Sequence, residues 1–331
     1  MARVHFLNVN DGDCSIIQHE NGDVTMIDVC NARSITQDAG GTQLLENKFS
    51  LMKGNFNQKE NPTNPIAYLN SIGVTTIFRY IQTHPDLDHM DGLSEIHKNF
   101  SIINFWDVDN DKKLDLSKSV KYHTDWKCYQ QLRDSKENPK SLYFLDGASQ
   151  KYFRMDDNGL KKDDYLQVLA PTKDLINIAK TTQNWNDSSY VILYCIHGKR
   201  ILFCGDADKN TILHIMAHHK LEVENLDVLI APHHGRDSGK DFSFLDIMKP
   251  RVTFLGNANS EYLAYNEWNN RNLVKFTNNQ LGNVVIDIDS KSFALYASNK
   301  LFVDKFREEN HRETNIRHNK LENMWLLWKI E

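Results

Sequence analysis

Four side chains able to bind a metal ion follow one apolar segment of this chain within six residues. Residues 77–81 are rich in β-branched and aromatic side chains, which predicts a buried strand. The loop that follows carries His84, Asp86, Asp88 and His89. A loop at the carboxyl end of a strand can direct alternate side chains at one point, and imidazole with carboxylate suits zinc, manganese or iron. A helix cap needs only one aspartate, so the loop predicts a metal site.

Two later strands also end in candidate ligands. A hairpin is predicted for residues 190–196 and 201–204, and its second strand runs into Asp206. Residues 226–231 form another apolar segment, which ends at His233 and His234. Each end alone could be a turn or a hydrogen-bonded loop. Together they predict an α/β layered protein with two metal ions at its strand ends, bridged by one carboxylate and a hydroxide.

The composition limits the class of protein. A chain of 331 residues can bury one large core or two modest ones, and 40% hydrophobic with 25% charged residues is typical of globular proteins. The formal net charge of −5 argues against general attraction to nucleic acid or anionic membranes. Five cysteines without a CxxC pair indicate buried reduced thiols. The sequence shows no apolar signal region or membrane-length apolar stretch, so we expect a cytoplasmic protein that does not bind membranes.

The remaining patterns predict how the chain is organised. Strands are expected at residues 4–9, 14–18 and 24–28, with helices at 65–72 and near 44–52. Residues 101–180 are less regular and predict an insertion without a sizeable core of its own, with a strand at 165–170. Residues 301–331 predict a helical C-terminal tail whose aromatic end docks on the body, because residues 301–330 contain no glycine or proline. Binding of a protein partner, or self-association, through that tail is the alternative.

Several short motifs together resemble a known superfamily. In chain order they are Leu7-Asn8-Val9-Asn10-Asp11-Gly12-Asp13, Ile27-Asp28, His84-Pro85-Asp86-Leu87-Asp88-His89, Asn186-Asp187-Ser188-Ser189, Gly205-Asp206 and Pro232-His233-His234-Gly235. This ordered set resembles the metallo-β-lactamase superfamily, and most of all its branch with the competence-protein (ComEC-like) hydrolase domain. The resemblance covers most of the chain outside residues 101–180 and the tail.

The resemblance implies a fold and a set of residue roles. The fold is a four-layer αββα sandwich over residues 1–300, with the insertion near 101–180 and the tail at 301–331. Asp28, Asn186 and Ser188 would support the ligands through hydrogen bonds. Two divalent ions, zinc or manganese, would be held by His84, Asp86, Asp88, His89, Asp206 and His233. Asp88 and His234 would act in catalysis, with the reverse order of His233 and His234 as the alternative.

One departure from the superfamily pattern guides the expected reaction. Asp86 stands where the superfamily usually has a second histidine, and an oxygen ligand makes the site harder, which favours manganese or magnesium relative to zinc. This argues against β-lactam hydrolysis. We therefore predict a metal-dependent phosphodiesterase or nuclease. Residues 121–133 could contact nucleic acid, and a half-buried helix of the insertion is the alternative for them.

Two alternatives to that reaction stay open. The first is a hydrolase of small phosphoesters, esters or lactones, with the insertion as a lid over a closed pocket. The second is a metal-binding partner subunit of a larger uptake, defence or repair system, which the tail and the insertion motivate.

Overall fold

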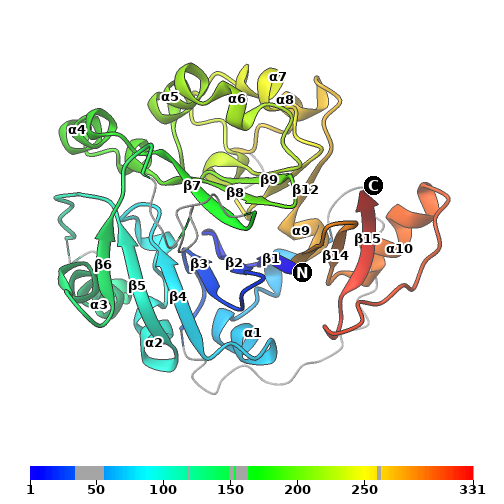
Figure 1. Cartoon of the computed structure of the whole chain (residues 1–331), viewed down its shortest axis with the longest axis horizontal. Helices are drawn as coiled ribbons and strands as arrows, with labels where there is room; N and C mark the ends of the chain where they lie inside the picture. Colours follow the sequence, from blue (N-terminus) through cyan, green and yellow to red (C-terminus); the bar gives the residue numbers. More distant parts are fainter. Residues whose placement is uncertain are drawn as a thin grey trace.

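The computed structural model describes residues 1–33, 56–115, 117, 119–148, 153, 163–258 and 262–330. The strands in these ranges form two sheets (Figure 1). The larger sheet has the order β15-β14-β13-β1-β2-β3-β4-β5-β6, and the smaller has the order β12-β11-β10-β9-β8-β7. The predicted helix near residues 44–52 lies outside the described residues.

The larger sheet is built from segments at both ends of the chain. Its strands are β1 (Ala2–Phe6), β2 (Ser15–Gln18), β3 (Val24–Ile27), β4 (Thr76–Ile81), β5 (Ser101–Asp107), β6 (Lys140–Tyr143), β13 (Val284–Ile288), β14 (Phe293–Ala297) and β15 (Trp325–Ile330). The smaller sheet contains β7 (Tyr165–Ala170), β8 (Val191–Ile196), β9 (Lys199–Phe203), β10 (Val228–Ile230), β11 (Val252–Leu255) and β12 (Lys275–Thr277). The predicted hairpin is confirmed, because β8 and β9 pair antiparallel.

Helices cover the outer face of each sheet. The larger sheet carries α1 (Pro65–Ser71), α2 (Leu93–Asn99) and α3 (His123–Asp134). The smaller sheet carries α4 (Lys173–Thr182), α5 (Lys209–His218), α6 (Lys220–Val223), α7 (Phe244–Met248) and α8 (Tyr265–Asn269). Two further helices, α9 (Asn278–Leu281) and α10 (Lys300–Glu309), lie toward the β14–β15 end of the larger sheet.

Three apolar cores lie between these layers. Side chains alternate between the two faces of a strand, so neighbouring residues of one strand belong to different cores. In β2, Ile17 faces the core between the two sheets, whereas its neighbour Ile16 faces the core under α1, α2 and α3. In β8, Ile192 faces the same central core and Leu193 faces the helices of the smaller sheet. The predicted αββα arrangement is confirmed. The five cysteines are buried and free, as expected.

The described residues between 101 and 180 contribute strands to both sheets. β5 and β6 extend the larger sheet in parallel, and β7 is the edge strand of the smaller sheet beside β8. Helix α3 packs on the same apolar core as α1 and α2. The described part of this segment therefore shares the cores of the main body, and the strand predicted at residues 165–170 is confirmed as β7.

The C-terminal segment differs from the sequence prediction. In the described part of this segment, residues 301–330, a helix is present only at α10. The prediction of a helical tail is wrong for residues 325–330, which form β15 on the edge of the larger sheet. Trp325 and Leu327 are buried in the central core, while Leu326 and Trp328 are less buried. This alternation fits a strand, and pairing with β14 decides the structure where composition favoured a helix.

No helix among the described residues combines the length and the apolar character that crossing a bilayer requires.

Candidate metal centre

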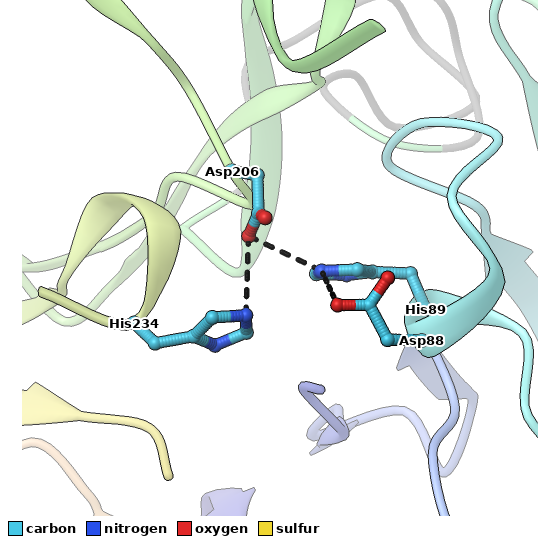
Figure 2. A group of neighbouring side chains, drawn as sticks. All are labelled: Asp88, His89, Asp206 and His234. Atoms are coloured by element: carbon cyan, nitrogen blue, oxygen red, sulfur yellow. Dashed lines mark ion pairs between the residues drawn. The ribbon is translucent and has the colours of Figure 1, made fainter. Parts of the chain in front are cut away.

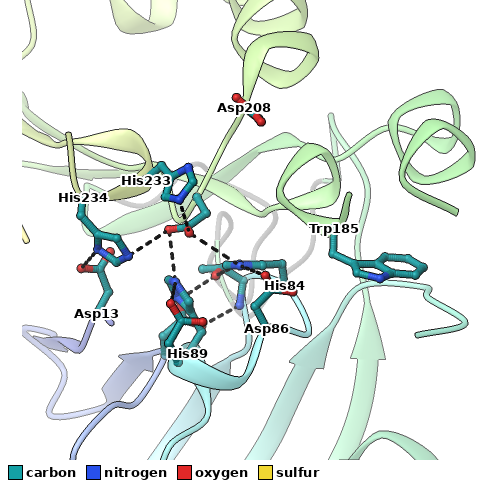
Figure 3. A network of polar contacts seen from close by, with 12 residues as sticks. Asp13, His84, Asp86, His89, Trp185, Asp208, His233 and His234 are labelled. Atoms are coloured by element: carbon teal, nitrogen blue, oxygen red, sulfur yellow. Dashed lines mark hydrogen bonds and ion pairs between the residues drawn. The ribbon is translucent and has the colours of Figure 1, made fainter. Parts of the chain in front are cut away.

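The candidate ligands meet where strand ends from both sheets come together. β4 leads into the loop that contains the short 3-10 helix η2 (Leu87–His89), and β3 ends beside it at Asp28. From the smaller sheet, β9 leads to Asp206 and β10 leads to η5 (Pro232–Gly235). Figure 3 shows the side chains from these elements converging. We call the seven predicted residues that meet here the Asp206 cluster: His84, Asp86, Asp88, His89, Asp206, His233 and His234.

The two carboxylate oxygens of Asp206 face different histidines. Its Oδ1 lies 3.1 Å from Nε2 of His89 and 3.5 Å from Nε2 of His234. Its Oδ2 lies 3.5 Å from Nε2 of His233 and 4.0 Å from Nε2 of His84. A carboxylate whose oxygens face two sets of nitrogen atoms is suited to bridge two cations.

Each of these two sets also contains a second aspartate. Oδ2 of Asp86 lies 3.8 Å from Nε2 of His84, and Oδ2 of Asp88 lies 4.0 Å from Nε2 of His89. On the Oδ1 side, ligand atoms of Asp88, His89, Asp206 and His234 all lie within 4.8 Å of one another (Figure 2).

Buried atoms without hydrogen bonds show that this cluster suits cations. Nε2 of His84, of His89 and of His234 and Oδ1 of Asp206 are buried and have no hydrogen-bond partner among the described residues. A buried polar atom left unpaired costs about 1–3 kcal/mol, so four in one place call for a ligand that binds nitrogen and oxygen lone pairs. A divalent metal ion fits this donor set.

Asp28 anchors the loop that follows β4 and carries the candidate ligands. Its Oδ2 accepts hydrogen bonds from Nδ1 of His89 at 2.8 Å and from the Thr83 hydroxyl at 2.6 Å, and its Oδ1 accepts from the Thr83 backbone N–H at 2.8 Å. Because the Thr83 hydroxyl hydrogen points to Asp28, the hydroxyl oxygen can accept from Nδ1 of His84, 3.0 Å away. Protonated Nδ1 atoms leave both Nε2 lone pairs free for metal binding.

The two later histidines are held through Nδ1 in the same way. Nδ1 of His234 lies 3.1 Å from Oδ1 of Asp13, and Nδ1 of His233 lies 2.8 Å from the hydroxyl of Ser238. His234 is 1% exposed, whereas the side chain of His233 is 16% exposed. The sequence analysis did not assign roles to Thr83, Asp13 or Ser238, although Asp13 lies within one of the resembling motifs.

The backbone is held in unusual conformations beside the cluster. Asp28, His233 and His234 have positive φ angles of 55°, 52° and 56°, which residues other than glycine rarely adopt. Gly205 also has a positive φ of 49°, and a Cβ atom there would lie 2.9 Å from Cβ of Thr83. Such strain concentrates at functional sites, where the surrounding structure maintains it.

Burial and neighbouring opposite charges have opposing effects on the pKa values of the side chains in the cluster. Burial lowers the pKa of His84 to about 3, so its ring is neutral at pH 7. For Asp206, burial opposes ionisation, but the charges of His89 and His234 outweigh it and hold the pKa well below the usual range. Asp206 is thus ionised and His84 neutral, which are the forms in which each binds a metal. Burial alone would lower the pKa of His234, but the carboxylates of Asp13 and Asp206 outweigh it and raise that pKa to about 9.

Lysines and a cavity lie beside the cluster. Lys112 forms an ion pair with Asp86, and Nζ of Lys240, which has no hydrogen-bond partner among the described residues, lies 3.7 Å from Oδ1 of Asp208. A cavity of about 240 Å³ opens next to Asp88, and its lining includes Lys59, Lys121 and Tyr122. Sequence reasoning included Lys121 and Tyr122 within residues 121–133 but did not name Lys59.

Asn186 and Ser188 lie in η4 (Trp185–Ser188), and their predicted support of the ligands stays a prediction. The Ser188 hydroxyl donates to the carbonyl of Trp185 at 2.8 Å. The intervening Asp187 instead anchors η4 to α5, since its carboxylate accepts from the backbone and side-chain N–H groups of Asn210 at 3.2 and 2.9 Å.

Comparisons with known proteins give likenesses to solved structures. No family model matches the chain, and no curated protein matches it. A diphosphatase of the PhnP family is 10% identical over 87% of this chain and 98% of that chain, with a TM-score of 0.42. A zinc-dependent hydrolase, described as putative, of the metallo-β-lactamase superfamily from Thermotoga maritima is 11% identical over 80% of each chain, with a TM-score of 0.33. The long-form RNase Z from yeast is 10% identical over 77% of this chain and 37% of that chain, with a TM-score of 0.36.

Proposed function

We propose that this chain is a hydrolase that uses two divalent ions, zinc or manganese, and that its substrates are phosphodiesters, including nucleic acid. The observation that carries the proposal is the division of the Asp206 cluster into two ligand sets, one on each oxygen of Asp206. When bound, the ions would polarise a phosphoryl oxygen and lower the pKa of an attacking water.

The two ions would have different ligands. His84 and Asp86 would hold the first ion with Oδ2 of Asp206. Asp88, His89 and His234 would hold the second with Oδ1. Asp86 makes the first set richer in oxygen, which supports manganese as well as zinc and supports a place in the competence-protein-like branch.

We assign His234 as the ligand and His233 as the proton donor, which reverses the order expected from the sequence. His234 is buried, and the carboxylate of Asp13 holds its Nδ1, a pairing typical of metal-bound histidine. His233 is more exposed and only a hydroxyl holds its Nδ1, so it is better placed to move a proton to a leaving oxygen. His234→Asn is expected to lose one bound ion, whereas His233→Asn should keep both ions and lower kcat.

The other groups at the site support a phosphoester substrate. Asp88 is the most exposed carboxylate of the cluster and borders the cavity, where it can orient a water molecule. Lys59 and Lys121 lie in the cavity wall with Asp11 and Asp91, and Nζ of Lys121 lies 3.2 Å from Oδ2 of Asp91. With metal ions bound to the aspartates of the cluster, these lysines could contact phosphate oxygens, and the Tyr122 ring offers a surface for stacking.

Cleavage assays with added zinc or manganese test the proposal. Wild-type protein is expected to cleave bis-p-nitrophenyl phosphate and at least one of single-stranded DNA and RNA. His84→Ala should lose this activity, and His97→Ala, which alters an exposed histidine on α2, should keep it. Equal activity of His84→Ala and wild type on all three substrates would refute the proposal.

A small phosphoester is the second candidate substrate, because the cavity beside Asp88 is small and Tyr122 comes from the 101–180 segment. Short oligonucleotides distinguish the two candidates. They should compete with bis-p-nitrophenyl phosphate if the site accepts nucleic acid, and they should not compete if this segment restricts access.

A further inference from the structure

A second group of histidine and aspartate side chains lies apart from the Asp206 cluster. Asp146 follows β6 in the crossover between the two sheets, and His214 and His219 lie on α5 and just after it. The backbone N–H of Asp146 donates to the carbonyl of Pro171 at 2.8 Å, which fixes the crossover beside β7. We call Asp146, His214 and His219 the Asp146 cluster.

The atoms of this cluster have the spacing of metal ligands. Nε2 of His214 lies 3.0 Å from Oδ2 of Asp146, and Nε2 of His219 lies 2.8 Å from Oδ1. One ligand atom from each residue lies within 4.8 Å of the others. Two ligands about 2.0 Å from a tetrahedral zinc ion are about 3.3 Å apart, so small side-chain shifts would accommodate an ion.

The close contact between His219 and Asp146 is not a hydrogen bond. His219 is 8% exposed, and its Nε2 and Oδ1 of Asp146 have no hydrogen-bond partner among the described residues despite lying 2.8 Å apart. The two atoms are near each other without facing each other. The same combination occurs between Nε2 of His89 and Oδ1 of Asp206.

We propose that Asp146, His214 and His219 bind a third divalent ion, of the zinc type, that ties the crossover after β6 to helix α5. Two imidazoles and one carboxylate are common zinc ligands, and water completes the tetrahedron. Oε1 of Glu222 lies 3.7 Å from Nδ1 of His219, on the side of the ring away from the ion. That carboxylate favours a proton on Nδ1 and so leaves Nε2 available to zinc.

The alternative is an ordinary ion pair in which Asp146 neutralises two protonated histidines. In that case each Nε2–H would be expected to point at a carboxylate oxygen, and only the His214 contact has that geometry. The two explanations predict different zinc contents, because an ion pair binds no metal.

Zinc stoichiometry tests the proposal on the full chain. Protein saturated with zinc and freed of excess metal is expected to hold one ion more than Asp146→Asn and one more than His214→Asn, measured by elemental analysis. His97→Asn, an exposed histidine on α2, is the matched control and should equal wild type. Asp146 and His214 are partly exposed, so these variants are expected to fold, which circular dichroism checks.

The same measurement in an Asp206→Asn background separates this site from the Asp206 cluster. Asp206→Asn should retain the third ion, and the double variant Asp206→Asn/Asp146→Asn should lose it. Equal zinc contents for wild type, Asp146→Asn and His214→Asn would overturn the third site. That result would leave the proposed hydrolase untouched, because the difference between wild type and Asp146→Asn does not depend on how many ions the Asp206 cluster holds.

Discussion

The Asp206 cluster and the Asp146 cluster contain the same kinds of side chain but are supported differently. In the Asp206 cluster, each histidine has a partner on Nδ1, and carboxylates of Asp28 and Asp13 hold two of them. In the Asp146 cluster, the carboxylate nearest a free Nδ1 is Glu222, at 3.7 Å and partly exposed. A site that performs chemistry needs fixed ligand directions, whereas a site that joins two segments needs only binding. We therefore expect the first cluster to govern activity and the second to govern stability.

Replacing the central aspartate of each cluster by asparagine should give the largest difference in activity between the two clusters. Asp206→Asn is expected to lower kcat/KM by roughly 10³-fold, because one oxygen facing each ligand set is required to hold two cations. Asp146→Asn should leave kcat/KM within about twofold of wild type, since Asp146 does not contact the site. Phosphodiester cleavage at saturating metal measures both. A comparable loss in the two variants would mean that the clusters are not functionally distinct.

Removal of the supporting carboxylates should give an intermediate difference. Three donors lie 2.6–2.8 Å from the carboxylate oxygens of Asp28, and the side-chain amide of Asp28→Asn would turn its NH₂ group toward one of them. We expect the affinity of the Asp206 cluster for zinc to fall by about 10–100-fold. Glu222→Gln is the corresponding substitution beside the Asp146 cluster. It should lower the zinc affinity of that cluster by less than about 10-fold, because Glu222 lies 3.7 Å from Nδ1 of His219. Competition with a chelator measures both affinities, and a larger effect of Glu222→Gln would reverse the comparison.

The sequence predicted which candidate ligands come together better than it predicted the side chains that support them. Candidate ligands such as His84 and Asp206 follow apolar strands, so a local pattern places them at strand ends. The partner of His234 is Asp13, which lies 221 residues earlier, and no local pattern connects them. His214 and Asp146 are likewise 68 residues apart, and the sequence analysis did not link them.

The tail illustrates the same limit for the fold. Its composition permits a helix, and only pairing with β14 turns residues 325–330 into a strand. Local periodicity therefore predicts the layers and the strand ends, whereas contacts between distant segments decide the edges of the sheet and the orientation of the ligands.

A substitution that disturbs only the contact between His234 and Asp13 should have the smallest effect on zinc affinity. A Cβ atom at Gly256 would lie 2.8 Å from Nδ1 of His234 and 2.8 Å from Oδ1 of Asp13, so Gly256→Ala should push this pair apart. We expect zinc affinity on that side of the Asp206 cluster to fall by about tenfold or less, because all the ligands remain. Gly198→Ala is the control, since it places a methyl group at a positive φ of 71° with no atom within 4 Å. The control should lose about 1 kcal/mol of stability through backbone strain and keep its zinc affinity. If both variants weaken zinc binding equally, general destabilisation explains the loss, and the contact between Asp13 and His234 does not orient a ligand.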